Sequence, residues 1–308
     1  ALNCYQKVIE IDPSYKQAYN NLGVVLLELG KYQEAINSYQ KAIEIDPSYK
    51  DALSNIGGIF KELGQYEKAM SFYEKAIKVD PNFIHAHFNR GVLLYEIGKY
   101  ENAMEVLKLI NFKNSNSYLL SCLFRLDKPS NFQELLNKII KIKEGNSFDA
   151  MIGSSCSRSK LKYGIDISNP FCNDPLKYVL KRNLTEICDF NNIFVKTVIK
   201  ILNKNNIPLK NQGLLTNGIQ TSGNLFNYEV ELTNKIKDII HSEIENYKKS
   251  FANSEEGFLK KFPHRYTLHG WLVSMKNGGK LDAHMHENGW LSGSIYINVP
   301  KKIKGDNG

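Results

Sequence analysis

The first third of the chain repeats one pattern of apolar and polar positions every 34 residues. The dipeptide Asp-Pro recurs at 12–13, 46–47 and 80–81, each time after an apolar stretch of helical periodicity. Other positions with this period are Gly23, Gly57 and Gly91; Gly30, Gly64 and Gly98; Tyr32, Tyr66 and Tyr100; and Ala35, Ala69 and Ala103. A fixed period of this length predicts stacked units of helix, short turn and helix.

The small residues of the unit have separate structural roles in this prediction. The first glycine, as at Gly23, stands where two helices pack closely, and the second, as at Gly30, ends the first helix with a positive φ. Ala35 and Ala42 let the second helix approach its partner. The Asp-Pro dipeptide closes the unit and places Pro in the first turn of the next helix.

Beyond about residue 145 the period is lost, and the pattern becomes mixed. Residues 146–164 are small and polar, which predicts a linker or long loop. A helix is expected near 193–202, a loop or short strand at 213–229, and an amphipathic helix at 231–251. Three strand-like stretches follow, at 264–276, 281–286 and 292–300. Helices followed by strands predict an α+β domain.

Composition narrows the function classes. The 308 residues carry a net charge of +8, but the lysines alternate with glutamates and form no basic stripe with aromatics, so no nucleic-acid partner is expected. No run of 18 apolar residues occurs, so neither a transmembrane helix nor a membrane partner is expected. Five cysteines without a Cys-x-x-Cys motif favour a reducing compartment, and the cytoplasm is the expected location.

The repeated part resembles the tetratricopeptide repeat. The resemblance covers a half repeat at 1–15 and full repeats at about 16–49, 50–83 and 84–117, the last of which has Leu107 in place of a tyrosine. It implies an α-helical solenoid whose concave surface binds a protein or peptide, with a spacer or dimerisation role as the alternative. Side chains that could hydrogen-bond an extended backbone, or simply face water, are Asn20, Asn21, Asn55 and Asn89.

Two histidines one residue apart, His284 and His286, are the main candidates for chemistry. A predicted glycine turn (277–279) precedes them, and a strand-like run (294–299) follows. Residues i and i+2 of a strand share a face, so both imidazoles would point to one site, as a metal requires. His85 and His87 have the same spacing but lie in a predicted helix, where such residues do not face each other, and His87 is expected to pack.

A second resemblance covers roughly residues 165–308, on the segments 212–226 and 269–300. These resemble the iron(II)/2-oxoglutarate-dependent oxygenases, which implies a partial double-stranded β-helix (a cupin-like jelly roll) that uses Fe(II) and 2-oxoglutarate. In that family two histidines and one carboxylate commonly bind iron. Here His286 stands where the carboxylate is expected, so the second ligand is His286, Glu287 or Asp282, with His284 and His286 favoured.

The remaining family residues are expected after Gly308. They are a distal histidine and an Arg or Lys that pairs with the 2-oxoglutarate carboxylate. Because both ends of the sequence look cut, this chain on its own is expected to bind iron weakly and to be inactive. The predicted organisation is tetratricopeptide repeats (1–117), an irregular helical cap (118–145), a linker (146–164) and a partial oxygenase-like domain (165–308).

Two functions follow from these patterns. The first is an iron(II)/2-oxoglutarate dioxygenase that hydroxylates a protein or peptide recruited by the repeats. The second is a non-catalytic scaffold for protein–protein interaction, which His286 at the carboxylate position favours. A zinc or cupin-type metalloenzyme with the same histidine pair is a third, weaker interpretation.

Overall fold

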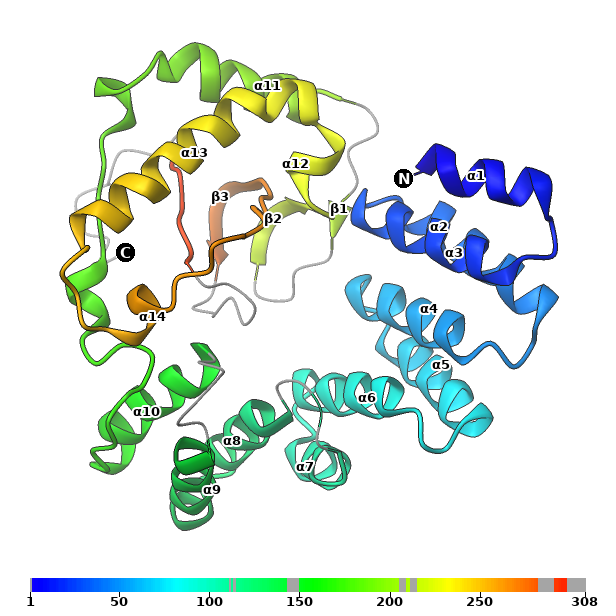
Figure 1. Cartoon of the computed structure of the whole chain (residues 1–308), viewed down its shortest axis with the longest axis horizontal. Coiled ribbons are helices and arrows are strands. Elements are labelled where there is room, and N and C mark those ends of the chain that lie inside the picture. The colour runs from blue at the N-terminus through cyan, green and yellow to red at the C-terminus, as the bar shows by residue number, and fades with distance from the viewer. Residues whose placement is uncertain are drawn as a thin grey trace.

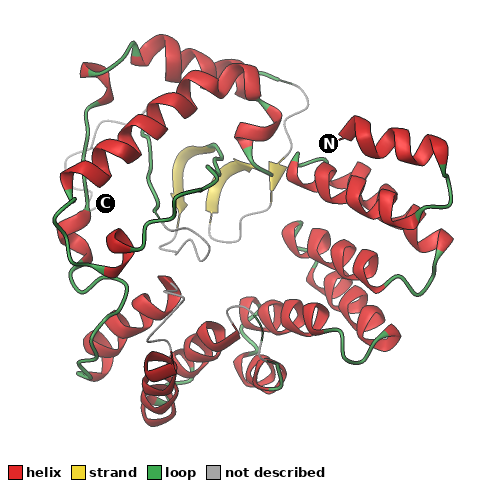
Figure 2. Cartoon of the chain, viewed as in Figure 1, coloured by secondary structure: helices red, strands yellow, loops and turns green. Residues whose placement is uncertain are grey.

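Helices dominate the structure, and in the described residues the strands are confined to the last third of the chain (Figure 2). The computed structural model describes residues 2–110, 112, 115–142, 150–204, 209–210, 215–281 and 291–297. Across these residues, no helix combines the length and the apolar character needed to cross a bilayer.

Ten helices follow one another in the described residues up to 163 and curve around one side of the molecule, from blue to green in Figure 1. They are α1 (Leu2–Ile11), α2 (Lys16–Glu28), α3 (Tyr32–Ile45), α4 (Lys50–Glu62), α5 (Tyr66–Val79), α6 (Ile84–Glu96), α7 (Tyr100–Lys108), α8 (Ser115–Arg125), α9 (Pro129–Ile142) and α10 (Ala150–Tyr163). Each packs mainly on its neighbours in sequence, so the array is a solenoid built from local contacts.

Close packing within each helix pair explains the first recurring glycine. A Cβ added at Gly57 of α4 would lie 2.7 Å from the Tyr73 ring of α5, and Gly23 lies equally close to Tyr39. Both tyrosines are fully buried. The predicted role of these glycines is therefore confirmed, because any larger residue would push the two helices apart.

The turns of the array use the second glycine and the Asp-Pro dipeptide. Gly30, Gly64 and Gly98 have φ values of 71°, 71° and 79°, which confirms their predicted helix-ending role. The position predicted for proline is wrong, because Pro13 lies in the turn and α2 begins only at Lys16. The Asp12 carboxylate accepts a hydrogen bond from the Ser14 backbone N–H at 2.9 Å, which fixes that turn.

Helices α8, α9 and α10 share one core with the last repeat. Phe132 and Leu136 of α9 are fully buried, and Met151, Ile152 and Cys156 of α10 belong to the same cluster. The predicted linker at 146–164 is therefore wrong over α10. The serines of this segment favoured the linker prediction, since small side chains are typical of loops. Small side chains also let helices pack closely, and this is their role in α10.

The last third of the described chain combines short helices with one small sheet. Its elements are η1 (Pro175–Tyr178), η2 (Leu184–Glu186), η3 (Asn191–Val195), α11 (Lys196–Leu202), β1 (Leu209–Lys210), β2 (Leu215–Thr221), α12 (Leu225–Tyr228), α13 (Val230–Ser250), α14 (Gly257–Lys260) and β3 (Val273–Leu281). The strands form an antiparallel sheet in the order β1-β2-β3. Helix α13 confirms the predicted amphipathic helix and buries Ile236 and Tyr247.

The predicted glycine turn before the histidines is wrong, because β3 continues through it. The register of β2 and β3 shifts between Thr216 and Gly218, and the two residues with positive φ there are Asn217 (49°) and Gly278 (73°). Gly278 thus lies at an irregularity of the strand pairing. The positive φ at this position costs little because glycine has no Cβ.

Two of the predicted strands are shorter or absent in the described residues. Residues 264–272 are irregular before β3 begins, and residues 291–297 have no strand hydrogen bonds. Tyr296 is 76% exposed. Alternating apolar residues form a strand only when another strand pairs with them, and the described residues supply none here.

The last third of the chain contacts the first repeat (Figure 1). The Asn224 backbone N–H donates to the Glu28 carbonyl at the end of α2, over 3.3 Å. Gly223 has φ +65°, and a Cβ there would lie 2.8 Å from the Gly30 nitrogen. The chain therefore closes on itself, with the turn at 222–224 against α2.

Candidate functional site

The asparagines predicted to bind a partner form a row across successive helices. The Asn55 Nδ2 of α4 donates to Asn20 Oδ1 of α2 at 3.0 Å, and Asn89 Nδ2 of α6 donates to Ser54 Oγ at 3.3 Å. Asn20 is buried, whereas Asn21 beside it is exposed. The structure thus gives three of them a role in joining repeats, and their role in partner binding stays a prediction.

The row retains hydrogen-bonding capacity. Asn55 and Asn89 are half-buried, and each uses its amide as a donor in the contacts just described. Each carbonyl oxygen can accept from an N–H group of an extended peptide. Exposed Asn21 accepts from Asn20 Nδ2 through its own Oδ1 at 3.4 Å and offers its Nδ2 as a donor. These side chains can therefore bind a peptide backbone while they hold the helices in register.

The predicted metal ligands lie outside the described residues. This applies to His284 and His286 and to the two alternative ligands Asp282 and Glu287. Strand β3 ends at Leu281, immediately before this segment. Among the residues that the structure describes, no three His, Cys, Asp or Glu side chains form a group able to hold a metal. The histidine pair therefore remains the predicted metal site.

The sheet that leads to this segment exposes apolar side chains. Met275 of β3 is 52% exposed and Ile219 of β2 is 46% exposed. Met275 pairs with Gly218 and Ile219 pairs with Ser274, so the two apolar side chains point to opposite faces. Neither face of the sheet is fully covered by the described residues.

Other histidines have structural contacts. His87 Nε2 lies 2.8 Å from the Pro81 carbonyl, and the His85 ring packs edge-on against Phe112 with 4.6 Å between the centroids. On α13, His241 Nδ1 lies 3.0 Å from the Tyr266 hydroxyl. These rings are held by carbonyl, aromatic and phenol groups.

The buried cysteines are unsuited to nucleophilic chemistry. All five cysteines are free thiols. Burial raises the pKa of Cys122 to about 12 and that of Cys156 and of Cys172 to about 11. At neutral pH these three groups remain protonated, and the thiolate is the reactive form.

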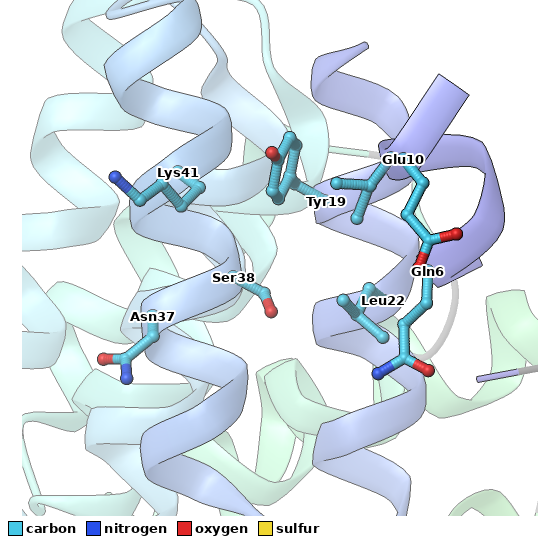
Figure 3. Close-up of a pocket in the computed structure, with 8 residues that line it drawn as sticks. Gln6, Glu10, Tyr19, Leu22, Asn37, Ser38 and Lys41 are labelled. Carbon is cyan, nitrogen blue, oxygen red and sulfur yellow. The ribbon is translucent and has the colours of Figure 1, made fainter. Parts of the chain in front are cut away.

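A pocket of about 480 Å³ opens between α1, α2 and α3 (Figure 3). Its lining residues are Gln6, Ile9, Glu10, Tyr19, Leu22, Asn37, Ser38 and Lys41. Sequence reasoning missed this pocket. The signal that could have revealed it is Ser38, because the equivalent positions 34 and 68 residues later are Phe72 and Val106.

Asn224 connects the candidate oxygenase segment with the array. Its side-chain Nδ2 donates to the Leu268 carbonyl at 2.8 Å, and its Oδ1 accepts from the Gly270 N–H at 3.0 Å. Its backbone N–H donates to Glu28 of α2. This buried residue therefore ties the start of the segment that leads into β3 to the first repeat.

Family comparisons identify the array. Models described as tetratricopeptide repeats match residues 17–49 and 38–70, and a model described as a TPR repeat matches residues 1–30 and 57–98. Residues 1–98 are tetratricopeptide repeats. The resemblance predicted from the 34-residue period is confirmed.

The C-terminal segment also matches a family. Residues 269–307 match the model described as "Putative 2OG-Fe(II) oxygenase". The match begins at the segment that Asn224 holds, includes β3, and extends over His284 and His286. It confirms the second resemblance for this segment of the chain.

Three solved structures illustrate what this chain is similar to. YrrB, "a TPR protein with an unusual peptide-binding site", is 18% identical, with 53% of this chain and 84% of that chain covered and a TM-score of 0.44. PilF of Pseudomonas aeruginosa is 21% identical (52% and 74% covered, TM-score 0.45). A repeat protein of Parabacteroides merdae is 20% identical (53% and 66% covered, TM-score 0.45). No curated protein matches the chain.

Proposed function

We propose that this protein is an iron(II)/2-oxoglutarate-dependent dioxygenase that hydroxylates a protein or peptide held by its tetratricopeptide array. The observation that carries the proposal is the oxygenase family match at 269–307 in a chain whose first 98 residues are such repeats. The contact of Asn224 with Glu28 supports a joint role for the two parts.

Within this proposal, the residues after β3 hold the metal. His284 and His286 would hold Fe(II) through their imidazoles, with Asp282 and Glu287 as the alternative second ligands, in a partial double-stranded β-helix. Bound Fe(II) and 2-oxoglutarate would supply the oxidant for hydroxylation of the partner, with O₂ consumed and succinate and CO₂ formed. The Arg or Lys that binds the 2-oxoglutarate carboxylate is expected after Gly308.

In this proposal, the repeats bind the partner polypeptide. The amides of Asn21, Asn55 and Asn89 hydrogen-bond an extended segment of that partner. A protein partner is favoured over nucleic acid because the lysines are dispersed among glutamates. Five free thiols support a reducing compartment, for which we propose the cytoplasm.

A non-catalytic scaffold is the alternative. The observation that favours it is His286, which stands where the family usually has a carboxylate. In that case the array alone carries the function, and the C-terminal part is a structural closure of the array.

The first experiment reads the coding DNA beyond Gly308. The oxygenase proposal predicts a strand-like segment with a histidine, followed about ten residues later by Arg or Lys. The protein from the whole reading frame is then titrated with Fe(II) without oxygen. His284→Ala should weaken iron binding at least tenfold, while His85→Ala, from the helical pair, should not. A reading frame without that histidine, or equal affinities, would favour the scaffold.

A further inference from the structure

The pocket between α1, α2 and α3 lacks a side chain that the next repeat supplies. The 34-residue period relates Ile9, Tyr19 and Ser38 of the pocket to Ile43, Leu53 and Phe72. Those three later residues belong to one hydrophobic cluster. In the second repeat, the Phe72 ring occupies the position that is equivalent to Ser38. In the first repeat, Ser38 lines a cavity of about 480 Å³.

The surroundings of Phe72 indicate which kind of side chain the pocket at Ser38 can bind. The Phe72 ring stacks on Phe60 with 5.5 Å between the centroids, and the Lys75 ammonium lies 4.7 Å from the Phe72 centroid. The residue equivalent to Lys75 is Lys41, which lines the pocket (Figure 3). An ammonium over a ring face stabilises an aromatic group in preference to an aliphatic one.

The rim of the pocket is polar, and its charge is not balanced. Lys41 Nζ is already paired with Glu44 Oε2 at 2.6 Å. Glu10 of α1 is exposed and lines the pocket together with Gln6, one helical turn earlier. The two carboxylates Glu44 and Glu10 outnumber the Lys41 ammonium here, which gives the rim a net negative character that complements a basic partner.

We propose that this pocket binds one aromatic side chain of a partner polypeptide, with a basic residue next to it that pairs with Glu10. Its lining includes the apolar side chains of Ile9 and Leu22. The Ser38 side chain points from α3 toward the side of Leu22 (Figure 3). An aromatic ring would complete the first repeat as Phe72 completes the second. The site differs from the asparagine row, so it adds a second partner contact that is independent of the oxygenase proposal.

The test titrates the ¹⁵N-labelled full chain with N-acetyl-Phe-Lys-amide and, as the matched probe, N-acetyl-Ala-Lys-amide. The side-chain amides of Gln6 and Asn37 report on binding. We expect the Phe probe to bind at least tenfold more tightly, and Glu10→Gln to weaken its binding about twofold to fivefold. Equal shifts with both probes, or none with either, would overturn the proposal.

Three variants locate the binding. Ser38→Phe fills the pocket from within and should abolish binding, and Ser38→Val, which copies Val106 of the third repeat, should weaken it. Ser71→Phe adds the same ring at an exposed position of α5 and should leave binding unchanged. Circular dichroism checks that each variant folds. Binding that survives both Ser38 changes, or a chain that dimerises through this pocket in sedimentation, would contradict the assignment to a partner.

Discussion

The array and the last third of the chain are stabilised in different ways. In the array, α2 packs on α3, α4 on α5 and α6 on α7, so each contact joins close neighbours in sequence. In the last third, β2 pairs with β3 across roughly 50 to 65 residues of sequence, and His241 meets Tyr266 from another segment. Local contacts form with little loss of chain entropy, whereas distant ones depend on the whole domain.

This difference shows where function can be built into such a chain. Repeats tolerate a change in one unit, such as Ser38 for Phe72, without loss of the others, and so can gain a pocket. The last third has only small clusters around Tyr247 and Ile236 in its described residues, and one end of it rests on α2 through Asn224.

The largest effect is expected in the helical cap. Phe132 of α9 is fully buried, with ring centroids 6.1 Å from Phe124 and 5.9 Å from Tyr163 of α10. Phe132→Ala should lower the free energy of unfolding by about 3–5 kcal/mol. Hydrogen exchange should increase in α10, whereas Leu161→Ala, at an exposed position, should change neither quantity. Unchanged protection of α10 would mean that it does not belong to the array core.

The next largest loss of stability is expected where the last third of the chain contacts the array. Gly223→Ala places a Cβ at positive φ and 2.8 Å from the Gly30 nitrogen. Strain of about 1–2 kcal/mol adds to the steric clash. Chemical denaturation should show this loss, and the radius of gyration from X-ray scattering should rise. Gly98→Ala, at φ +79° with open space around it, should show the strain without the expansion.

Substitution of two adjacent glycines of α4 by alanine should change the stability of the chain in opposite directions. A Cβ at Gly57 meets the Tyr73 ring, so Gly57→Ala should destabilise the chain by about 1–3 kcal/mol. A Cβ at Gly58 meets nothing within 4 Å, so Gly58→Ala should stabilise it by about 0.5–1 kcal/mol. Thermal unfolding of both variants checks the sign. A stabilised Gly57→Ala would contradict the helix packing described for the repeats.

The smallest effect is expected on the stability of the array at low pH. The Lys16 ammonium, together with Ser48, lowers the pKa of Asp46 from 3.8 to about 2. Because the folded pKa lies below the unfolded value, the pair stabilises the fold above about pH 4, and this is lost as the pH falls toward 2. Lys16→Met should reduce the fall in melting temperature over that range. Lys41→Met, which removes a lysine paired within its own helix, should leave it unchanged.

The array was predictable because its signals are local. A period of 34 with Gly23, Gly30 and the tyrosines needs only the contacts of neighbouring helices, and the structure reproduces it. Helix α10 was missed because buried Ser155 and Ser159 have the composition of a loop. Helix α10 packs on α8 and α9, where Tyr163 meets Phe124 and Phe132, and no local pattern reveals these contacts.

The candidate sites were only partly predictable. The contacts that join Asn20 to Asn55 and Asn89 to Ser54 depend on how far one helix is rotated against the next, and a sequence does not give this directly. The bulge at Gly278 arises from pairing with a strand some sixty residues earlier. The histidine pair lies outside the described residues and remains a prediction from its spacing and family match.

The most direct test of the central claim is succinate formation by the protein from the whole reading frame. It is assayed with Fe(II), ascorbate, O₂ and 2-oxoglutarate, for the unchanged protein and for His284→Ala and His85→Ala. The account predicts succinate from the unchanged protein and from His85→Ala, and at least a hundredfold less from His284→Ala. Equal succinate formation by all three proteins, or none from the unchanged protein, would contradict an oxygenase whose metal is held at His284.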